Sequence, residues 1–118
     1  VAAFFHVAAV SDFRPEAPRK GKVDSNTPHT LQLVPTTKII KSLRKIFPST
    51  LLIGWKYEAE GTLDSIRTKG VKQMEQCKAD GCVLNGPAYG TGYGLLREKV
   101  HHCNSEHELF TRLITLLP

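Results

Sequence analysis

Val7-Ala-Ala-Val-Ser-Asp-Phe-Arg14 follows directly on the apolar run Val1-Ala-Ala-Phe-Phe-His6 at the start of this chain. An apolar run that abruptly meets polar and charged groups is typical of a buried strand that ends there. Two later apolar runs also end at polar residues: residues 51–55 before Lys56 and Glu58, and residues 81–84 before Asn85. In open α/β sheets ligands bind just outside the carboxyl ends of the strands, so three such ends predict one shared crevice.

Helical patterns alternate with these strands. An apolar stripe at helical spacing covers residues 39–47, and a second helix follows Thr62 with Gly70 on its inner face. Residues 105–108, Ser-Glu-His-Glu, form a capping box that opens a last helix. This alternation predicts an α/β fold. We expect a three-layer, Rossmann-like arrangement with a mainly parallel sheet and a short antiparallel extension.

Three other segments complete the expected organisation. Short extended pieces are expected around residues 22–25 and 30–34, and the glycine-rich residues 86–94 are expected to form a mobile loop. The chain begins inside an apolar strand, whereas a central parallel strand needs a neighbour on each side. We therefore expect a partial domain, the carboxyl part of something longer.

Composition restricts the class of protein. The 118 residues suit one domain, and the formal net charge of +5 favours anionic partners or serves solubility alone. Three cysteines are too few for a disulfide framework and indicate the cytoplasm. The first apolar run is shorter than the roughly 20 residues that span a bilayer, and it lacks the pattern of a signal peptide. No membrane partner is expected.

Basic residues gather in the loop after the first strand: Arg14, Arg19, Lys20 and Lys22. Such a loop is either a flexible cover that neutralises phosphates or an ordinary solvated loop. Composition alone leaves both interpretations open, although the loop adjoins the expected crevice.

Other polar residues at the strand ends have two interpretations each. Ser11 and Asp12 end the first strand, where Asp12 would orient a ribose, coordinate a cation or cap a turn. Lys56 and Glu58 alternate with two aromatic residues, so their charges share one face as a functional pair or a surface pair.

Metal and dinucleotide motifs are disfavoured. Cys77 and Cys82 fit no paired zinc-ligand spacing and are expected to be buried as small hydrophobic side chains. The glycines at positions 90, 92 and 94 lack the spacing of a dinucleotide-binding fingerprint.

Taken in order, five segments resemble the phosphopantothenate–cysteine ligases, which in many bacteria form the carboxyl half of the DNA/pantothenate-metabolism flavoprotein. They are Ala8-Ala-Val-Ser-Asp-Phe-Arg-Pro15, Gly21-Lys-Val23, Leu31-Gln-Leu-Val-Pro35, Ile53-Gly-Trp-Lys-Tyr-Glu58 and Asp80-Gly-Cys-Val-Leu-Asn85. The resemblance implies a ligase of coenzyme A biosynthesis, which joins 4′-phosphopantothenate to cysteine through an acyl-nucleotide made from CTP or ATP.

The resemblance also implies where the base of the nucleotide binds. The strand end at Ala8 and Ala9 matches the backbone segment that reads the base, and Trp55 takes the place of a phenylalanine near it. The expected site is further lined by Ser11, Lys56 and Asn85.

The chemistry at the phosphates is implied in the same way. Asp12 is expected near the nucleotide and its Mg²⁺, and Lys22 matches the family's essential lysine in a loop over the triphosphate. Magnesium and lysine charge would stabilise the leaving pyrophosphate. No flavin is expected, because the flavin-binding half has no counterpart here. Family members are dimers, which makes residues 22–34 the expected homodimer interface, with Leu31 and Leu33 covered.

Departures from the family leave alternatives open. The substrate-side half carries an Asn-x-Ser-Ser-Gly-like segment that this chain lacks, so the chain is expected to be the nucleotide-reading half and inactive alone. Residues 54–58, Gly-Trp-Lys-Tyr-Glu, differ from the bacterial Gly-Phe-Ala-Ala-Glu, which leaves CTP and ATP open with CTP favoured. The second hypothesis is a non-catalytic nucleotide-binding or dimerisation module. A nucleic-acid binder is disfavoured, because the aromatic residues lie mostly in apolar runs.

Overall fold

The computed structural model describes residues 1–8 and 10–118 of the chain, in two units. The larger unit contains residues 1–7 and 39–118, and the smaller contains residues 8–38. Each unit has its own β-sheet.

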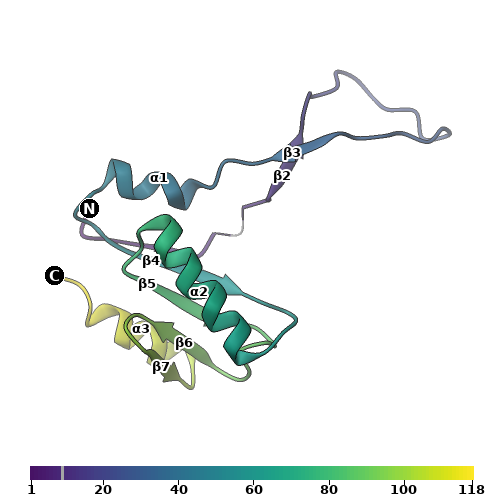
Figure 1. Cartoon of the computed structure of the whole chain (residues 1–118). Coiled ribbons are helices and arrows are strands. Elements are labelled where there is room, and N and C mark those ends of the chain that lie inside the picture. Colours follow the sequence, from purple (N-terminus) through teal and green to yellow (C-terminus); the bar gives the residue numbers. More distant parts are fainter. Residues whose placement is uncertain (9) are drawn as a thin grey trace. The chain divides into compact units, whose positions relative to one another are not determined.

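The described part of the larger unit is built on a five-stranded sheet with the strand order β1-β4-β5-β6-β7 (Figure 1). Its elements are β1 (Ala3–His6), α1 (Ile39–Ile46), β4 (Leu51–Tyr57), α2 (Leu63–Cys77), β5 (Gly81–Asn85), β6 (Tyr93–Leu96), β7 (Val100–Cys103) and α3 (Glu106–Ile114). Strands β1, β4 and β5 run parallel, and β6 and β7 continue the sheet antiparallel. The predicted α/β fold, with a parallel sheet and an antiparallel extension, is confirmed.

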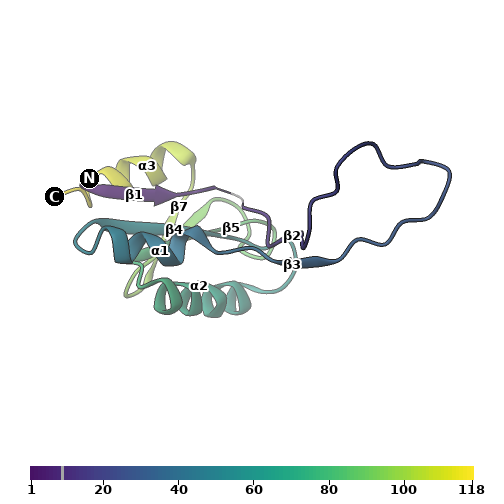
Figure 2. The same cartoon turned by 90° about the horizontal axis from the view of Figure 1, so that it is seen from above.

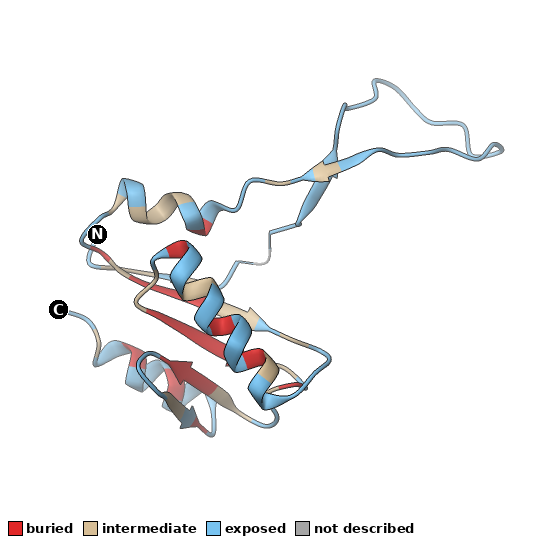
Figure 3. Cartoon of the chain, in the orientation of Figure 1, coloured by how far each residue is buried: buried red, intermediate tan, exposed pale blue. Residues whose placement is uncertain are grey.

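Helices cover both faces of this sheet, so the larger unit has three layers (Figure 2). Successive strand residues point to opposite faces. Leu52 and Leu84 therefore pack in clusters with α1 and α2, whereas Ile53 and Val83 pack with α3. Figure 3 shows buried residues on β4, β5 and β6 and on the side of α2 that faces the sheet. None of the described helices is long and apolar enough to cross a membrane.

Gly70 brings α2 close to the sheet. The residue is buried, and a Cβ added to it would lie 2.6 Å from Leu84 Cδ2 and 3.0 Å from Leu96 Cδ2. A glycine costs a helix about 1 kcal/mol relative to alanine, and here the missing side chain provides room for two leucines. The predicted place of Gly70 on the inner helix face is confirmed.

An arginine clamp holds the amino ends of the parallel strands. Arg44 of α1 donates from Nη2 to Asp80 Oδ2 at 2.7 Å and from Nη1 to the Thr50 carbonyl at 2.8 Å. The same Asp80 oxygen accepts a hydrogen bond from Leu52 N at 2.8 Å. One carboxylate thus links α1, β4 and the residue before β5, on the side of the sheet opposite the strand ends expected to bind ligand.

The smaller unit is an antiparallel hairpin of β2 (Phe13–Pro15) and β3 (Leu33–Pro35), and nearly all of its residues are exposed. The expected extended piece at residues 22–25 is not a strand, and β2 begins nine residues earlier than that piece. A three-residue strand that contains proline has too little alternation to reveal a period of two. Tertiary pairing with β3, rather than local preference, makes residues 13–15 extended.

The loop after β5 is shorter than expected. Residues 86–94 were expected to be one loop, but Tyr93 and Gly94 already belong to β6. Gly94 fits in a strand because the ring of Tyr89 lies over it: an added Cβ would lie 2.5 Å from Tyr89 Cε2. Composition predicts that this glycine lies in a loop, whereas in the structure it lies in a strand and leaves room for the aromatic ring of Tyr89.

Candidate functional site at the carboxyl ends of the strands

The carboxyl ends of β4 and β5 bring three predicted site residues to one edge of the sheet. Tyr57 pairs with Asn85 and Lys56 with Leu84, and Glu58 N donates to the Asn85 carbonyl at 3.1 Å. Trp55, Lys56 and Asn85 therefore lie on adjacent strands at one edge. Parallel β1 is the neighbour of β4 on the other side and ends at the same edge.

These three residues face two sides of the sheet. Trp55 is half-buried and packs against the cluster beneath α3. Asn85 follows Val83 by two residues and so belongs to the same face, whereas Lys56 points to the face that α2 covers. The predicted site is thus two half-sites, an aromatic and amide half on one face and a charged half on the other.

The charged half centres on Glu58. Its Oε1 lies 3.2 Å from Lys56 Nζ, and its Oε2 lies 2.9 Å from Lys69 Nζ of α2. The hydrogen bond from Lys69 lowers the pKa of Glu58 below its ordinary value of 4.5, although burial raises it, and Lys56 lowers it further. The predicted shared face of Lys56 and Glu58 is confirmed, and the carboxylate stays ionised at neutral pH.

A glutamine fixes the backbone beneath Trp55. Gln73 of α2 donates from Nε2 to the Trp55 carbonyl at 3.2 Å. A Cβ added to Gly54 would lie 2.7 Å from the same nitrogen, so only glycine leaves the amide its place. The end of β4 is thereby tied to α2 at one of the predicted site residues.

Asn85 and Gly86 form the end of β5. Gly86 has φ +105°, and a Cβ added to it would lie 2.6 Å from the Glu58 carbonyl oxygen. Asn85 Oδ1 is buried, and no described residue donates a hydrogen bond to it. Buried polar atoms usually have a partner, so this oxygen is an acceptor with capacity for one further donor.

The remaining predicted site residues belong to the smaller unit, except Ala9, which lies outside the described residues. Ala8, Ser11 and Asp12 precede β2 and are exposed. The carbonyl of Asp12 accepts a hydrogen bond from Thr36 N at 2.8 Å, and its Oδ1 lies 3.9 Å from Lys38 Nζ. The bond to the Asp12 carbonyl continues the pairing of β2 with β3, and the Asp12 carboxylate is open to solvent.

Lys22 lies in the loop that joins β2 to β3, so the short hairpin separates it from Asp12. Gly21 precedes it with φ +87° in open space. Within the described part of the chain, the Lys22 ammonium has neither a hydrogen bond nor an ion pair. The same loop turns where Asn26 N donates to Asp24 Oδ1 at 3.0 Å. An unpaired ammonium in an open loop suits either a phosphate cover or a solvated loop.

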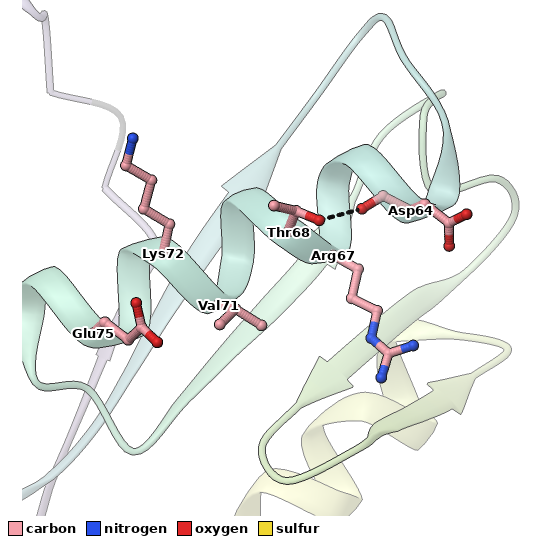
Figure 4. A pocket seen from close by; sticks show the side chains of 6 residues that line it. All are labelled: Asp64, Arg67, Thr68, Val71, Lys72 and Glu75. Atoms are coloured by element: carbon pink, nitrogen blue, oxygen red, sulfur yellow. Dashed lines mark hydrogen bonds between the residues drawn. The ribbon is translucent and has the colours of Figure 1, made fainter.

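Surface hollows elsewhere do not coincide with these strand ends. One pocket lies along the solvent side of α2 (Figure 4) and is lined by Asp64, Arg67, Thr68, Val71, Lys72 and Glu75. All six belong to one helix, and Thr68 Oγ1 uses its hydrogen to bond the Asp64 carbonyl at 2.9 Å. A single helix side without walls cannot enclose a small molecule.

No group of three or more metal-ligating side chains occurs among the described residues. Burial raises the pKa of the Cys82 thiol to about 12, so it stays protonated and packs as a hydrophobic side chain. Cys77, Cys82 and Cys103 are all buried.

Two residues of the site were not predicted: Lys69 and Gln73. They lie four positions apart in α2: Lys69 reaches Glu58, which directly follows β4, and Gln73 reaches Trp55 of β4. Spacing of four places both on one helix face, which is the signal the sequence offers. The sequence around these two residues does not indicate that this helix face meets the end of β4.

The family described as the DNA/pantothenate metabolism flavoprotein C-terminal domain matches residues 1–111. The chain belongs to this family. A curated relative of the chain is the coenzyme A biosynthesis bifunctional protein CoaBC of Thermococcus kodakarensis, which is 36% identical over 78 residues. That match covers 66% of the chain and 19% of the relative, so the chain spans about a fifth of the length of the curated relative it matches. The resemblance found in the sequence is confirmed.

Several solved structures share the fold of this chain. The DNA/pantothenate metabolism flavoprotein from Streptococcus pneumoniae has a TM-score of 0.76 at 20% identity, over 94% of this chain and 60% of that one. The C-terminal domain of a CoaBC protein has a TM-score of 0.61 at 22% identity, over 93% of this chain and 51% of that one. A Cab2 variant in complex with phosphopantothenate-cysteine has a TM-score of 0.68 at 16% identity, over 91% and 41%.

Proposed function

We propose that this chain is the nucleotide-reading part of a ligase that joins 4′-phosphopantothenate and cysteine in coenzyme A biosynthesis. The observation that carries the proposal is the family match over residues 1–111. It is supported by the relative named as a coenzyme A biosynthesis protein and by a fold neighbour in complex with phosphopantothenate-cysteine. The reaction would proceed through an acyl-nucleotide formed from CTP or ATP, and the proposal favours CTP.

The proposed nucleotide site uses the strand ends described above. Backbone groups at Ala8 and Ala9 would read the edge of the base, and Trp55 would offer an aromatic surface beside it. Ser11, Lys56 and Asn85 would line the site, and the unpartnered Asn85 oxygen is a suitable acceptor for a ligand donor. A site that pairs such groups rejects the wrong base, because buried polar atoms are then left without partners.

The phosphates would be handled by Lys22 and by a cation near Asp12. The Asp12 carboxylate is 74% exposed, so its oxygens are open to a ligand. Magnesium suits this environment, since proteins often bind it through one or two carboxylates together with substrate phosphates. The ion would neutralise phosphate charge. The flexible, unpaired Lys22 ammonium would stabilise charge that develops on the leaving pyrophosphate, which makes Lys22 the proposed catalytic residue.

Closure of the Lys22 loop would protect the reactive anhydride from water. The loop consists of residues 16–32, all of which are exposed, so its movement would disrupt no buried packing. The amine of cysteine would then attack the activated carboxylate and release the nucleoside monophosphate. The working form we propose is a cytoplasmic homodimer paired through residues 22–34, where Leu31 and Leu33 are 60% and 47% exposed.

Calorimetric titration of the chain with CTP, ATP and UTP tests the binding part of this proposal. We expect weak binding of a triphosphate, with CTP preferred. The chain alone should release no pyrophosphate in response to phosphopantothenate. Equal affinity for CTP and ATP would remove the case for a base-reading site, and phosphopantothenate-dependent pyrophosphate release would overturn the assignment to one half of the enzyme.

The alternative is a non-catalytic nucleotide-binding or dimerisation module of the same fold. The observation that favours it is the exposure of Leu31 and Leu33, at 60% and 47%, which suits a dimerisation role. The two hypotheses separate when the chain is mixed with the substrate-side half of a related ligase. Restored product formation supports the ligase, and nucleotide binding without product supports the module.

A further inference from the structure

Two ammonium groups share one carboxylate where β4 leaves the sheet. Lys56 and Lys69 contact separate oxygens of Glu58, at 3.2 and 2.9 Å. The three side chains carry a formal charge of +1, because one carboxylate cannot neutralise two lysines. The Glu58 side chain is 19% exposed, whereas Lys56 and Lys69 are 32% and 49% exposed. The excess positive charge therefore lies on the side of the cluster that faces solvent.

The backbone holds this cluster in place. Glu58 N donates to the Asn85 carbonyl, and the Glu58 carbonyl accepts from Ala88 N, each at 3.1 Å. The backbone of Glu58 is thus hydrogen-bonded to β5 and to the loop after it. Lys56 extends from β4 and Lys69 from α2, so the two ammonium groups come from different rigid elements. Their positions are set before any ligand arrives.

We propose that Lys56 and Lys69, positioned by Glu58, form an anion-binding pair that takes a phosphate group of a substrate. Each ammonium has three N–H donors and gives one to Glu58, which leaves donors free for phosphate oxygens. The inference rests on the proposed function, whose substrates include two phosphate carriers, the nucleoside triphosphate and 4′-phosphopantothenate. Phosphate is the chemistry the two carriers share, and the experiment separates them.

The amino end of α2 is a poor place for an anion. Its capping box already uses Ser65 N, which donates to Thr62 Oγ1, and Thr62 N donates to Ser65 Oγ. Anions bind helix starts through free amides, and the Asp64 carboxylate in the first turn opposes an anion at the amides that remain. The two lysines are therefore the groups at this edge that would meet a phosphate.

Binding of inorganic tripolyphosphate to the full chain, measured calorimetrically at low salt, tests the pair. Lys56→Gln and Lys69→Gln should each weaken binding about fivefold to tenfold, whereas Lys69→Arg, which keeps the charge, should stay within about twofold. Lys72→Gln is the matched control: it removes the same charge from the same helix, on the side shown in Figure 4, and should change affinity less than twofold. Equal losses in all three glutamine variants would overturn the proposal.

Glu58→Gln gives a change of opposite sign. Removal of the competing carboxylate leaves both ammonium charges for the ligand, so tripolyphosphate should bind about threefold to tenfold more tightly. A merely structural ion-pair cluster would give unchanged or weaker binding, and that result overturns the proposal, as does no binding by the unmodified chain. Thermal melting of each variant verifies that the fold is retained.

Displacement experiments identify the source of the phosphate. CTP but not cytidine should displace tripolyphosphate if the nucleotide supplies it, and 4′-phosphopantothenate but not pantothenate should do so otherwise. Displacement by neither compound overturns the inference. If CTP and 4′-phosphopantothenate each bind equally to the unmodified, Lys56→Gln and Lys69→Gln chains, the inference fails while the proposed function stands. If tripolyphosphate shows the expected pattern but no nucleotide binds, the proposed function fails and the anion site stands.

Discussion

Lys22 is the residue on which the proposed chemistry depends most. Its ammonium is unpaired in the described structure, so replacement removes no interaction that stabilises the fold. In the complete enzyme, Lys22→Gln should slow acyl-nucleotide formation by about 2–4 kcal/mol, the range for loss of one preorganised electrostatic contact. Affinity for the nucleotide should change less, because the contact strengthens as charge develops on pyrophosphate.

Single-turnover measurement of pyrophosphate release decides this prediction. Lys20→Gln serves as the control, since it removes the same charge from the same loop. A near-normal rate for Lys22→Gln, or an equal loss in both variants, would assign Lys22 to the solvated part of the loop.

Glu58 makes stability depend on pH. Its pKa is lowered in the folded chain, chiefly by the hydrogen bond from Lys69, from an ordinary value of 4.5. A carboxyl with a lowered folded pKa stabilises the fold above its unfolded pKa and loses that contribution as pH falls through the folded pKa. The free energy of unfolding of the unmodified chain should therefore exceed that of Glu58→Gln at pH 7, and the difference should shrink as pH falls below 4.5 and through the lowered folded pKa of Glu58. Urea unfolding at several pH values measures this, and a pH-independent difference would contradict it.

At the level of helices and strands, Gly70 allows α2 to pack close to the sheet because it has no side chain. Gly70→Ala gains about 1 kcal/mol of helix propensity, yet its methyl would lie 2.6 Å from Leu84 Cδ2, and Leu84 is fully buried. Overpacking of a tight core costs about 1–3 kcal/mol, so we expect a net loss of about 1 kcal/mol. Val71→Ala on the exposed side of α2 should be neutral or slightly stabilising. A Gly70→Ala variant as stable as Val71→Ala would show that Leu84 can move aside.

The clamp at the amino ends of the strands is the second element-level prediction. Arg44→Leu leaves Asp80, which also accepts from Leu52 N, without its cationic partner. Hydrogen bonds to charged groups contribute about 1.5–3 kcal/mol, and the free energy of unfolding should fall by about that amount. A double-mutant cycle with Asp80→Asn should give a coupling energy above about 0.5 kcal/mol. Additive losses would mean that the two residues act independently.

For the molecule as a whole, the proposed assembly depends on the exposed apolar residues of the hairpin unit. Leu31→Glu together with Leu33→Glu should convert a homodimer to a monomer, because two charges would then be buried at the interface. Ile46→Glu changes an apolar residue that is 64% exposed in α1 and should leave the dimer intact. Sedimentation velocity at several concentrations distinguishes these outcomes. An unmodified chain that remains a monomer at high concentration would contradict the proposed interface.

Local pattern was enough for the layered core. Strands β4 and β5 are apolar runs of the length typical of buried strands, and Gly70 lies on the inner helix face. Thr62 and Ser105 cap helices as expected, but the capping box predicted at residues 105–108 is only half formed, because Glu108 Oε2 accepts from Asn104 N instead of Ser105 N. These features depend on neighbours in sequence, through periodicity and capping, so they are readable without tertiary information. The ordered motifs carried the family assignment for the same reason. Polar residues that must lie at the ends of successive strands occur in a fixed order along the chain.

Only the folded structure decided which distant groups meet. Lys69 and Gln73 reach the end of β4 and the residue after it because α2 packs on this part of the sheet. Tyr93 and Gly94 belong to a strand because β6 pairs with β5 and β7, and Phe13 belongs to a strand because β3 pairs with it. The division of Trp55 and Lys56 between two sheet faces also became visible only there. Such contacts join residues far apart in the chain, and their free energy comes from pairing and packing that no local preference encodes.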